Sequence, residues 1–155
     1  MCSSDLSRDT HAFSLYSIDL KTHAVKRLTN DEQAIRFGNW SPDGKSIAYT
    51  RAGQPWWRPW YRGSVAAQTV LTELSTGKTH SLIKTSTQQF NPLFSADGKS
   101  IFQTMIYGNS NTPNLWRVPL DGKNPTPVTH YATDAVRFPN MARNGSLLTY
   151  LWNGD

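Results

Sequence analysis

Apolar and polar residues alternate with a period of two along much of the chain. The segments Tyr16-Ser-Ile-Asp-Leu20 and Val70-Leu-Thr-Glu-Leu74 show the alternation clearly. This period is typical of half-buried β-strands, whose successive side chains point to opposite faces of a sheet. No segment combines the i, i+3, i+4 apolar spacing of an amphipathic helix with capping residues at its ends. The pattern therefore predicts an all-β chain.

One turn phrase occurs three times, at intervals of about 50 residues. The copies are Trp40-Ser-Pro-Asp-Gly-Lys-Ser-Ile-Ala-Tyr49, Phe94-Ser-Ala-Asp-Gly-Lys-Ser-Ile-Phe-Gln103 and Met141-Ala-Arg-Asn-Gly-Ser-Leu-Leu-Thr-Tyr150. In the first copy, Pro42 presets φ, Asp43 caps the turn locally and Gly44 takes the positive φ of a tight hairpin. The later copies are expected to use the structural turn residues Asp97, Gly98, Asn144 and Gly145.

A second phrase, typical of a strand, recurs at about the same intervals as the turn phrase. Its copies are Tyr16–Leu20, Val70–Leu74 and Trp116–Leu120. Two hairpins in every repeat of about 50 residues predict four-stranded antiparallel blades of a β-propeller. The expected fold is a partial β-propeller with two complete blades and two half blades. Its predicted units are a half blade at 11–30, a blade at 35–84, a blade at 89–130 and a half blade at 135–155.

Individual strands are expected in each unit. They are placed at 13–20 and 24–29; at 35–40, 46–51, 68–74 and 79–84; at 89–94, 100–106, 114–120 and 125–129; and at 136–141 and 146–151. Twelve strands in this order do not close a ring, so both ends are interpreted as truncated. Because such ends expose unpaired strand edges, the chain expressed alone is expected to be prone to aggregation.

Residues 1–10 are expected to be disordered or artefactual. Residues 1–6 read as the translation of a sequencing adapter, and a lipidated Cys2 is the alternative interpretation. Cys2 is the single cysteine, so the chain cannot form an internal disulfide. The sequence does not decide between the periplasm and the cytoplasm of a prokaryote as the compartment, and it slightly favours the periplasm.

The net charge is +5. The lysines and arginines are scattered beside predicted turns and form no basic stripe, so a nucleic-acid partner is not expected. No apolar run approaches the ~20 residues of a spanning helix, so no membrane span is expected. The expected partners are peptides or other domains of the same parent chain.

The turn phrases and Leu28-Thr-Asn30 resemble the repeats of TolB-type propellers. A closer resemblance is to the N-terminal six-bladed propeller of tricorn-like serine peptidases, and four segments carry it. They are Trp60-Tyr-Arg-Gly63, Thr112-Pro-Asn-Leu-Trp-Arg-Val-Pro-Leu-Asp-Gly122, Val128-Thr-His130 and Asp134-Ala-Val-Arg-Phe-Pro139. The resemblance implies a propeller that guides peptides to a serine peptidase core, whose catalytic residues have no counterpart in this chain. The alternatives are a TolB-like interaction propeller and the N-terminal propeller of an amidohydrolase or a prolyl oligopeptidase-like hydrolase.

The sequence offers no catalytic site, cofactor site or metal site. A nucleophile elbow requires Gly-x-Ser-x-Gly, which does not occur. His23 and His80 fall at equivalent hairpins, which favours turn residues over metal ligands, because ligands converge on one point. The turn residues Asp43 and Asp97 likewise do not form an acid–base pair.

The connection from Arg51 to Val65 is the one candidate binding segment. Three of the six tryptophans lie in it, and loops longer than ~12 residues are often functional. In one interpretation its rings fill the space between blades or face another domain. In the other they form a peptide-binding surface with nearby residues of the same face. The peptide-binding candidates are Trp57, Arg58, Trp60, Tyr61, Arg62 and His130, and the face is also expected to include Asp134 and Arg137.

Overall fold

The computed structural model describes residues 13–29, 33–51 and 57–154. The described strands are β1 (Tyr16–Ile18), β2 (Val25–Arg27), β3 (Ile35–Trp40), β4 (Ser46–Arg51), β5 (Gln68–Glu73), β6 (Thr79–Ser81), β7 (Gln89–Phe94), β8 (Ser100–Met105), β9 (Asn114–Pro119), β10 (Thr126–Pro127), β11 (Arg137–Met141) and β12 (Leu148–Leu151). The prediction for residues 1–10 and the part of the candidate connection at residues 52–56 fall outside the described residues.

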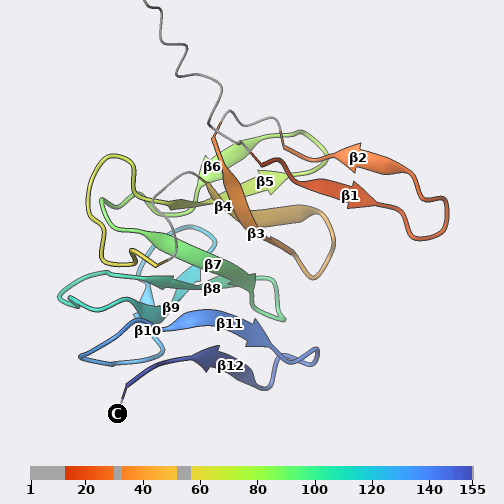
Figure 1. Ribbon diagram of the computed structural model, residues 1–155. Helices are drawn as coiled ribbons and strands as arrows, with labels where there is room; N and C mark the ends of the chain where they lie inside the picture. Colours follow the sequence, from red (N-terminus) through yellow and green to blue (C-terminus); the bar gives the residue numbers. More distant parts are fainter. Residues whose placement is uncertain (1–12, 30–32, 52–56, 155) are drawn as a thin grey trace, which may run out of the picture.

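The strands form four antiparallel sheets. Two are four-stranded, in the orders β3-β4-β5-β6 and β7-β8-β9-β10, and two are two-stranded, β1-β2 and β11-β12. Figure 1 shows the two four-stranded sheets between the two-stranded ones, with β3, β7 and β11 following one another across the stack. The predicted fold class is confirmed: the chain forms two four-stranded blades and two half blades of a β-propeller.

The outermost strands β2, β6 and β10 are shorter than the sequence predicts. Pro127 has no N–H to continue the ladder, and a threonine side chain then takes over from the backbone. Thr129 Oγ1 accepts the Leu115 N–H at 3.0 Å, and Thr29 Oγ1 accepts the Leu15 N–H at 3.0 Å. Hydroxyl acceptors thus replace carbonyl acceptors at equivalent places in two sheets.

The repeated turn is held by a serine that precedes it. The Ser41 hydroxyl donates to Asp43 at 2.6 Å and accepts the Ser46 N–H at 2.9 Å, while Gly44 has a φ of 68°. The second copy repeats this arrangement with Ser95, where the hydroxyl lies 2.6 Å from the carboxylate of its aspartate. These hydrogen bonds lower the pKa of both turn aspartates, with the serine hydroxyl as the largest cause.

Asn144 replaces aspartate in the third copy of the turn. Its side-chain oxygen accepts from the N–H and the hydroxyl of Ser146, at 3.1 and 2.7 Å. Gly145 has a φ of 72°, close to the value at Gly44. An amide therefore performs the same local capping as a carboxylate, and the turn does not depend on a charge.

Two clusters of buried apolar side chains stabilise the blades. The larger one joins the two four-stranded sheets through residues such as Leu71 and Phe94. The smaller one lies in the first four-stranded sheet around Tyr49, and Leu15 and Leu28 of the β1-β2 hairpin pack against it. The base of this hairpin is therefore attached to the first blade by apolar contact.

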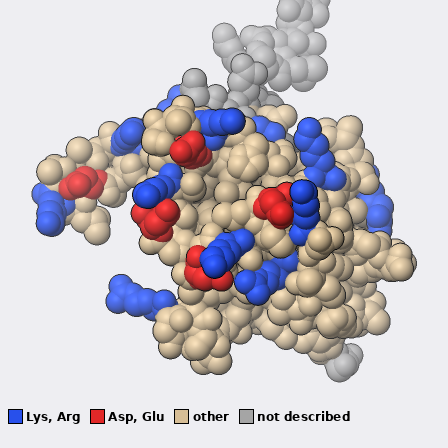
Figure 2. Space-filling view, turned by 180° about the vertical axis from the view of Figure 1, so that it is seen from behind, with Lys and Arg blue, Asp and Glu red and all other residues tan. Residues whose placement is uncertain are grey.

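The surface mixes the two signs of charge. Figure 2 shows acidic side chains beside basic ones over one face, with no continuous basic stripe on it. The structure contains no helix, in the part of the chain that it describes, that is long and apolar enough to cross a membrane.

Candidate functional site

The segment from Trp57 to Ala67 is attached to the start of the second four-stranded sheet. The buried side chain of Gln88 donates to the Arg58 carbonyl at 2.8 Å and accepts the Ala67 N–H at 3.0 Å. Gly63 donates its N–H to the Ser86 carbonyl at 2.8 Å. The backbone of the candidate loop is therefore held at several points by the connection that precedes β7.

The aromatic rings of this loop are open to solvent on a fixed backbone. Trp57 is 63% exposed and Trp60 is 45% exposed. The Arg58 guanidinium lies over the Tyr61 ring, 5.8 Å from its centroid, which is a cation–π geometry. Arg58 and Arg62 are exposed as well. The loop thus presents flat apolar surface and positive charge together.

Pro59 is the buried part of the loop. It lines a small cavity with residues of the first strand of each of the next two sheets, β7 and β11, and of the segment before β11; these include Phe90, Asn91, Val136 and Phe138. The first strands of their sheets, β3, β7 and β11, are called the inner strands below. The loop therefore reaches from the first blade to the inner strands of the next two sheets. The rings of Trp57 and Trp60 do not fill the space between these blades, because both are exposed. A surface that faces another domain and a surface that binds peptides both stay open as interpretations.

Each inner strand carries a left-handed residue at the same position. Phe37, Asn91 and Phe138 have φ values of 55°, 53° and 50°. The register shifts at each of these places, as in a β-bulge. The rings of Phe37 and Phe138, from β3 and β11, have centroids 6.4 Å apart. Because bulky residues rarely adopt this conformation, β3 and β11 are strained at Phe37 and Phe138, and Phe138 also lines the Pro59 cavity.

The sequence analysis missed these bulges, although a signal was present. Pro92 and Pro139 directly follow the left-handed residues inside predicted strands. Proline cannot donate to a ladder, so within sheets it is confined to edges, first positions and bulges. Two prolines at equivalent positions of inner strands therefore indicate a repeated bulge.

Arg137 begins β11, and Asp134 lies in the connection that precedes it. The Arg137 Nη2 atom is 3.5 Å from Asp134 Oδ1, and Arg137 also lines the Pro59 cavity. Two further residues of the predicted binding face are thus at the place where the loop meets β11.

His130 lines a different cavity, of about 320 Å³. Its neighbours there include Tyr107, Trp116 and Tyr131, and the Tyr107 and Trp116 rings meet edge to face at 5.4 Å. Tyr131 stacks on Trp152 at 3.9 Å and shares a hydrogen bond of 2.7 Å with Tyr150, which raises the pKa of Tyr131. The structure thus places this candidate apart from the small cavity that Pro59 lines.

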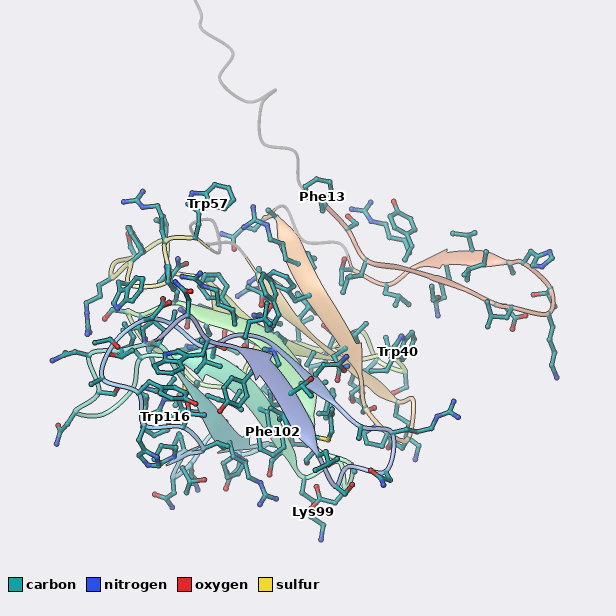
Figure 3. The ribbon with its side chains drawn as sticks, turned by 60° about the horizontal axis from the view of Figure 1, so that its bottom comes forward. Phe13, Trp40, Trp57, Lys99, Phe102 and Trp116 are labelled. Carbon is teal, nitrogen blue, oxygen red and sulfur yellow. The ribbon has the colours of Figure 1, made fainter. Side chains whose placement is uncertain are left out.

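The loop and the turns lie at opposite ends of the blades. Figure 3 shows Trp57 at one end of the sheets and Lys99, in the second copy of the turn, at the other. This arrangement follows from the meander, in which each strand reverses direction. Among the residues that the structure describes, no three histidine, cysteine, aspartate or glutamate side chains are grouped as they are around a metal ion.

No protein-family model and no curated protein matches the sequence. Solved structures do match the fold. TolB from Acinetobacter baumannii has a TM-score of 0.61 and 23% identity, over 87% of this chain and 31% of that one. An oligogalacturonate lyase in complex with manganese has a TM-score of 0.70 and 15% identity, over 92% and 42%. Puromycin hydrolase has a TM-score of 0.60 and 19% identity, over 84% and 20%.

These likenesses show the fold that the chain shares with TolB-type propellers and with part of a hydrolase. The chain spans about a third of the Acinetobacter TolB and a fifth of puromycin hydrolase. At identities below 25%, these likenesses show a shared fold and do not transfer the activity of those proteins to this chain.

Proposed function

We propose that this chain is a non-catalytic propeller segment of a tricorn-like peptidase, which selects peptides and guides them to a catalytic core outside its 155 residues. The observation that supports this most is the pair of exposed tryptophans, Trp57 and Trp60, on a loop whose backbone is held by Gln88. A held loop loses little conformational entropy on binding, so its exposed rings are suited to recognition.

The chemistry of the loop suits the end of a peptide. Tryptophan rings offer large apolar contact areas, and arginine binds carboxylates through two parallel hydrogen bonds. In the proposal, Trp57 and Trp60 contact an apolar side chain of the peptide, while Arg58 and Arg62 bind its carboxylate or carbonyl groups. Phe138, which lines the same small cavity as Pro59, adds apolar surface next to the loop.

A second candidate is a TolB-like interaction propeller. The Acinetobacter TolB structure supports it, because its 23% identity is the highest of the three neighbours described above. Such a propeller uses the same face to hold a folded protein partner and delivers no peptide to an active site. An N-terminal propeller of an amidohydrolase or a prolyl oligopeptidase-like hydrolase has support from the fold alone.

Alanine replacements in the loop test the proposed function. Arg58→Ala and Arg62→Ala are each expected to weaken peptide binding about tenfold, because a hydrogen bond to a charged group contributes about 1.5–3 kcal/mol. The measurements are peptide affinity for the chain and peptide turnover by the protein that carries the core. Lys123→Ala, at an exposed turn on the opposite end of the blades, is the matched control. Unchanged affinity and turnover in both arginine variants would argue against a peptide-guiding loop.

A further inference from the structure

A polar groove of about 500 Å³ lies directly beside the candidate loop. One of its walls is the end of the loop at Gly63 and Ser64, and the other is the connection between β6 and β7 at Lys84 and Ser86. All residues that line it lie between Gly63 and Ser86 in the sequence. This is the Lys84 groove, and it continues the candidate loop without a break in the chain.

The two walls of the Lys84 groove are joined by hydrogen bonds. The Gly63 N–H donates to the Ser86 carbonyl at 2.8 Å. Gln68 also lines the groove, and its side-chain Nε2 donates to the Ala67 carbonyl at 2.9 Å and to the Thr85 carbonyl at 3.2 Å. The spacing of the walls is therefore set before a ligand binds, which reduces the entropy lost on binding.

Three polar side chains of the groove are open to a ligand. Lys84, Ser64 and Ser86 are all exposed. Within the described part of the chain, the Lys84 ammonium forms no ion pair and the two serine hydroxyls form no hydrogen bond. No aspartate or glutamate is among the residues that line the groove. An ammonium group and two hydroxyl donors, with no competing carboxylate, favour an anion that has several acceptor oxygens.

We propose that the Lys84 groove binds an acidic side chain of the peptide that the loop holds. This inference rests on the proposed function, because the loop arginines fix the end of the same peptide. Only two residue steps separate Arg62 from Ser64, which is at most ~7 Å of chain, and two extended peptide residues cover that length. A glutamate or aspartate just before the last residue, or one position earlier, therefore reaches the groove while the terminal carboxylate is at Arg62.

Paired peptides test the acidic side-chain site. Both are free acids that end in an aromatic residue, and they differ only by glutamate or glutamine at one of these two positions. The glutamate peptide is expected to bind about fivefold tighter by calorimetry, and salt should narrow the difference, because an exposed charge pair is screened. Lys84→Ala should abolish the difference. Lys78→Ala, at an exposed turn on the opposite end of the same sheet, removes the same charge and should keep it.

A variant without the hydroxyls separates local recognition from attraction at a distance. Ser64→Ala combined with Ser86→Ala keeps the charge of Lys84 and is expected to reduce the fivefold preference to about twofold. A preference that stays fivefold in this variant would overturn the groove as the site. Inorganic phosphate offers the same anionic chemistry as a free ion. At the concentration of the peptide it is expected to leave the preference unchanged, and loss of the preference would make the free anion the ligand instead.

The same titrations distinguish this inference from the proposed function. Peptides that bind better as free acids than as amides, but equally well with glutamate and with glutamine, would overturn the acidic side-chain site and leave the peptide-binding loop intact. A chain that binds none of these peptides would overturn both.

Discussion

Replacing Gln89 with leucine is expected to lower the free energy of unfolding by about 3–5 kcal/mol, because several buried polar groups would lose their partners. Gln89 is 0% exposed. Its Oε1 accepts the Thr69 N–H at 3.1 Å, and its Nε2 donates to the Ile83 carbonyl at 2.9 Å. Leucine has a similar volume and neither polar group, so the buried Thr69 N–H and the partly buried Ile83 carbonyl would both lose these hydrogen bonds.

The position of Gln89 explains why its effect should be large. Thr29 and Thr129 supply hydroxyl acceptors to the third strand of their blades, and the equivalent residue of the first four-stranded sheet is Ile83. Ile83 has no hydroxyl. The Thr69 N–H is the counterpart of the Leu15 and Leu115 N–H groups, which donate to threonine hydroxyls. The Gln89 Oε1 atom accepts the Thr69 N–H in place of a threonine hydroxyl.

A compensating variant makes this prediction specific. Ile83→Thr introduces the hydroxyl that the other blades have, so it is expected to restore part of the stability lost in Gln89→Leu. Unfolding in urea measures both changes, and Gln33→Leu, at an exposed glutamine, is the control. If Ile83→Thr destabilises the double variant as much as it destabilises the wild type, the proposed replacement of threonine by Gln89 is wrong.

Replacing Gln88 with leucine is expected to release the candidate loop. The substitution removes the hydrogen bonds to the Arg58 carbonyl and the Ala67 N–H, which together contribute about 2–3 kcal/mol. Trypsin should then cut after Arg62 at least tenfold faster under native conditions, because each 1.4 kcal/mol changes the open population tenfold.

Limited proteolysis followed by mass spectrometry measures this release. Cleavage after Arg117, on β9, is the internal control and should stay slow if the sheets remain folded. A loop that is cut no faster in Gln88→Leu than in the wild type would show that Gln88 does not hold it. Peptide affinity should fall in the same variant, because a released loop loses more entropy on binding.

The repeat phrases predicted the blades because each strand and turn depends on local sequence. Asp43 and Gly44 shape their hairpin through contacts within a few residues, and such contacts can be derived from a phrase. The serine that precedes the turn was not recognised, although it recurs at Ser41 and Ser95. Its hydroxyl makes hydrogen bonds to both sides of the turn, and this arrangement becomes clear only from the geometry.

The candidate site was harder to predict because it depends on contacts between sheets. The tryptophans of the loop indicated a special segment, but the hydrogen bond from Gln88 to Arg58 joins residues 30 positions apart. The separate cavity at His130 also depends on contacts between residues that are distant in the sequence. It depends on how Tyr107, Trp116 and Tyr131 pack around β9, and no local pattern encodes that packing.

In the proposed function, the loop with Trp57, Arg58, Trp60 and Arg62 recognises peptide ends, and a pair of peptides that differ only at the C-terminus tests this role. The measurement is a calorimetric titration of the chain with a short peptide that ends in an aromatic residue, as the free acid and as the amide. If the loop binds the terminal carboxylate, the acid should bind at least tenfold tighter than the amide, and the difference should be lost in Arg58→Ala or Arg62→Ala. Equal affinity for acid and amide, or a preference that survives both arginine substitutions, would contradict it.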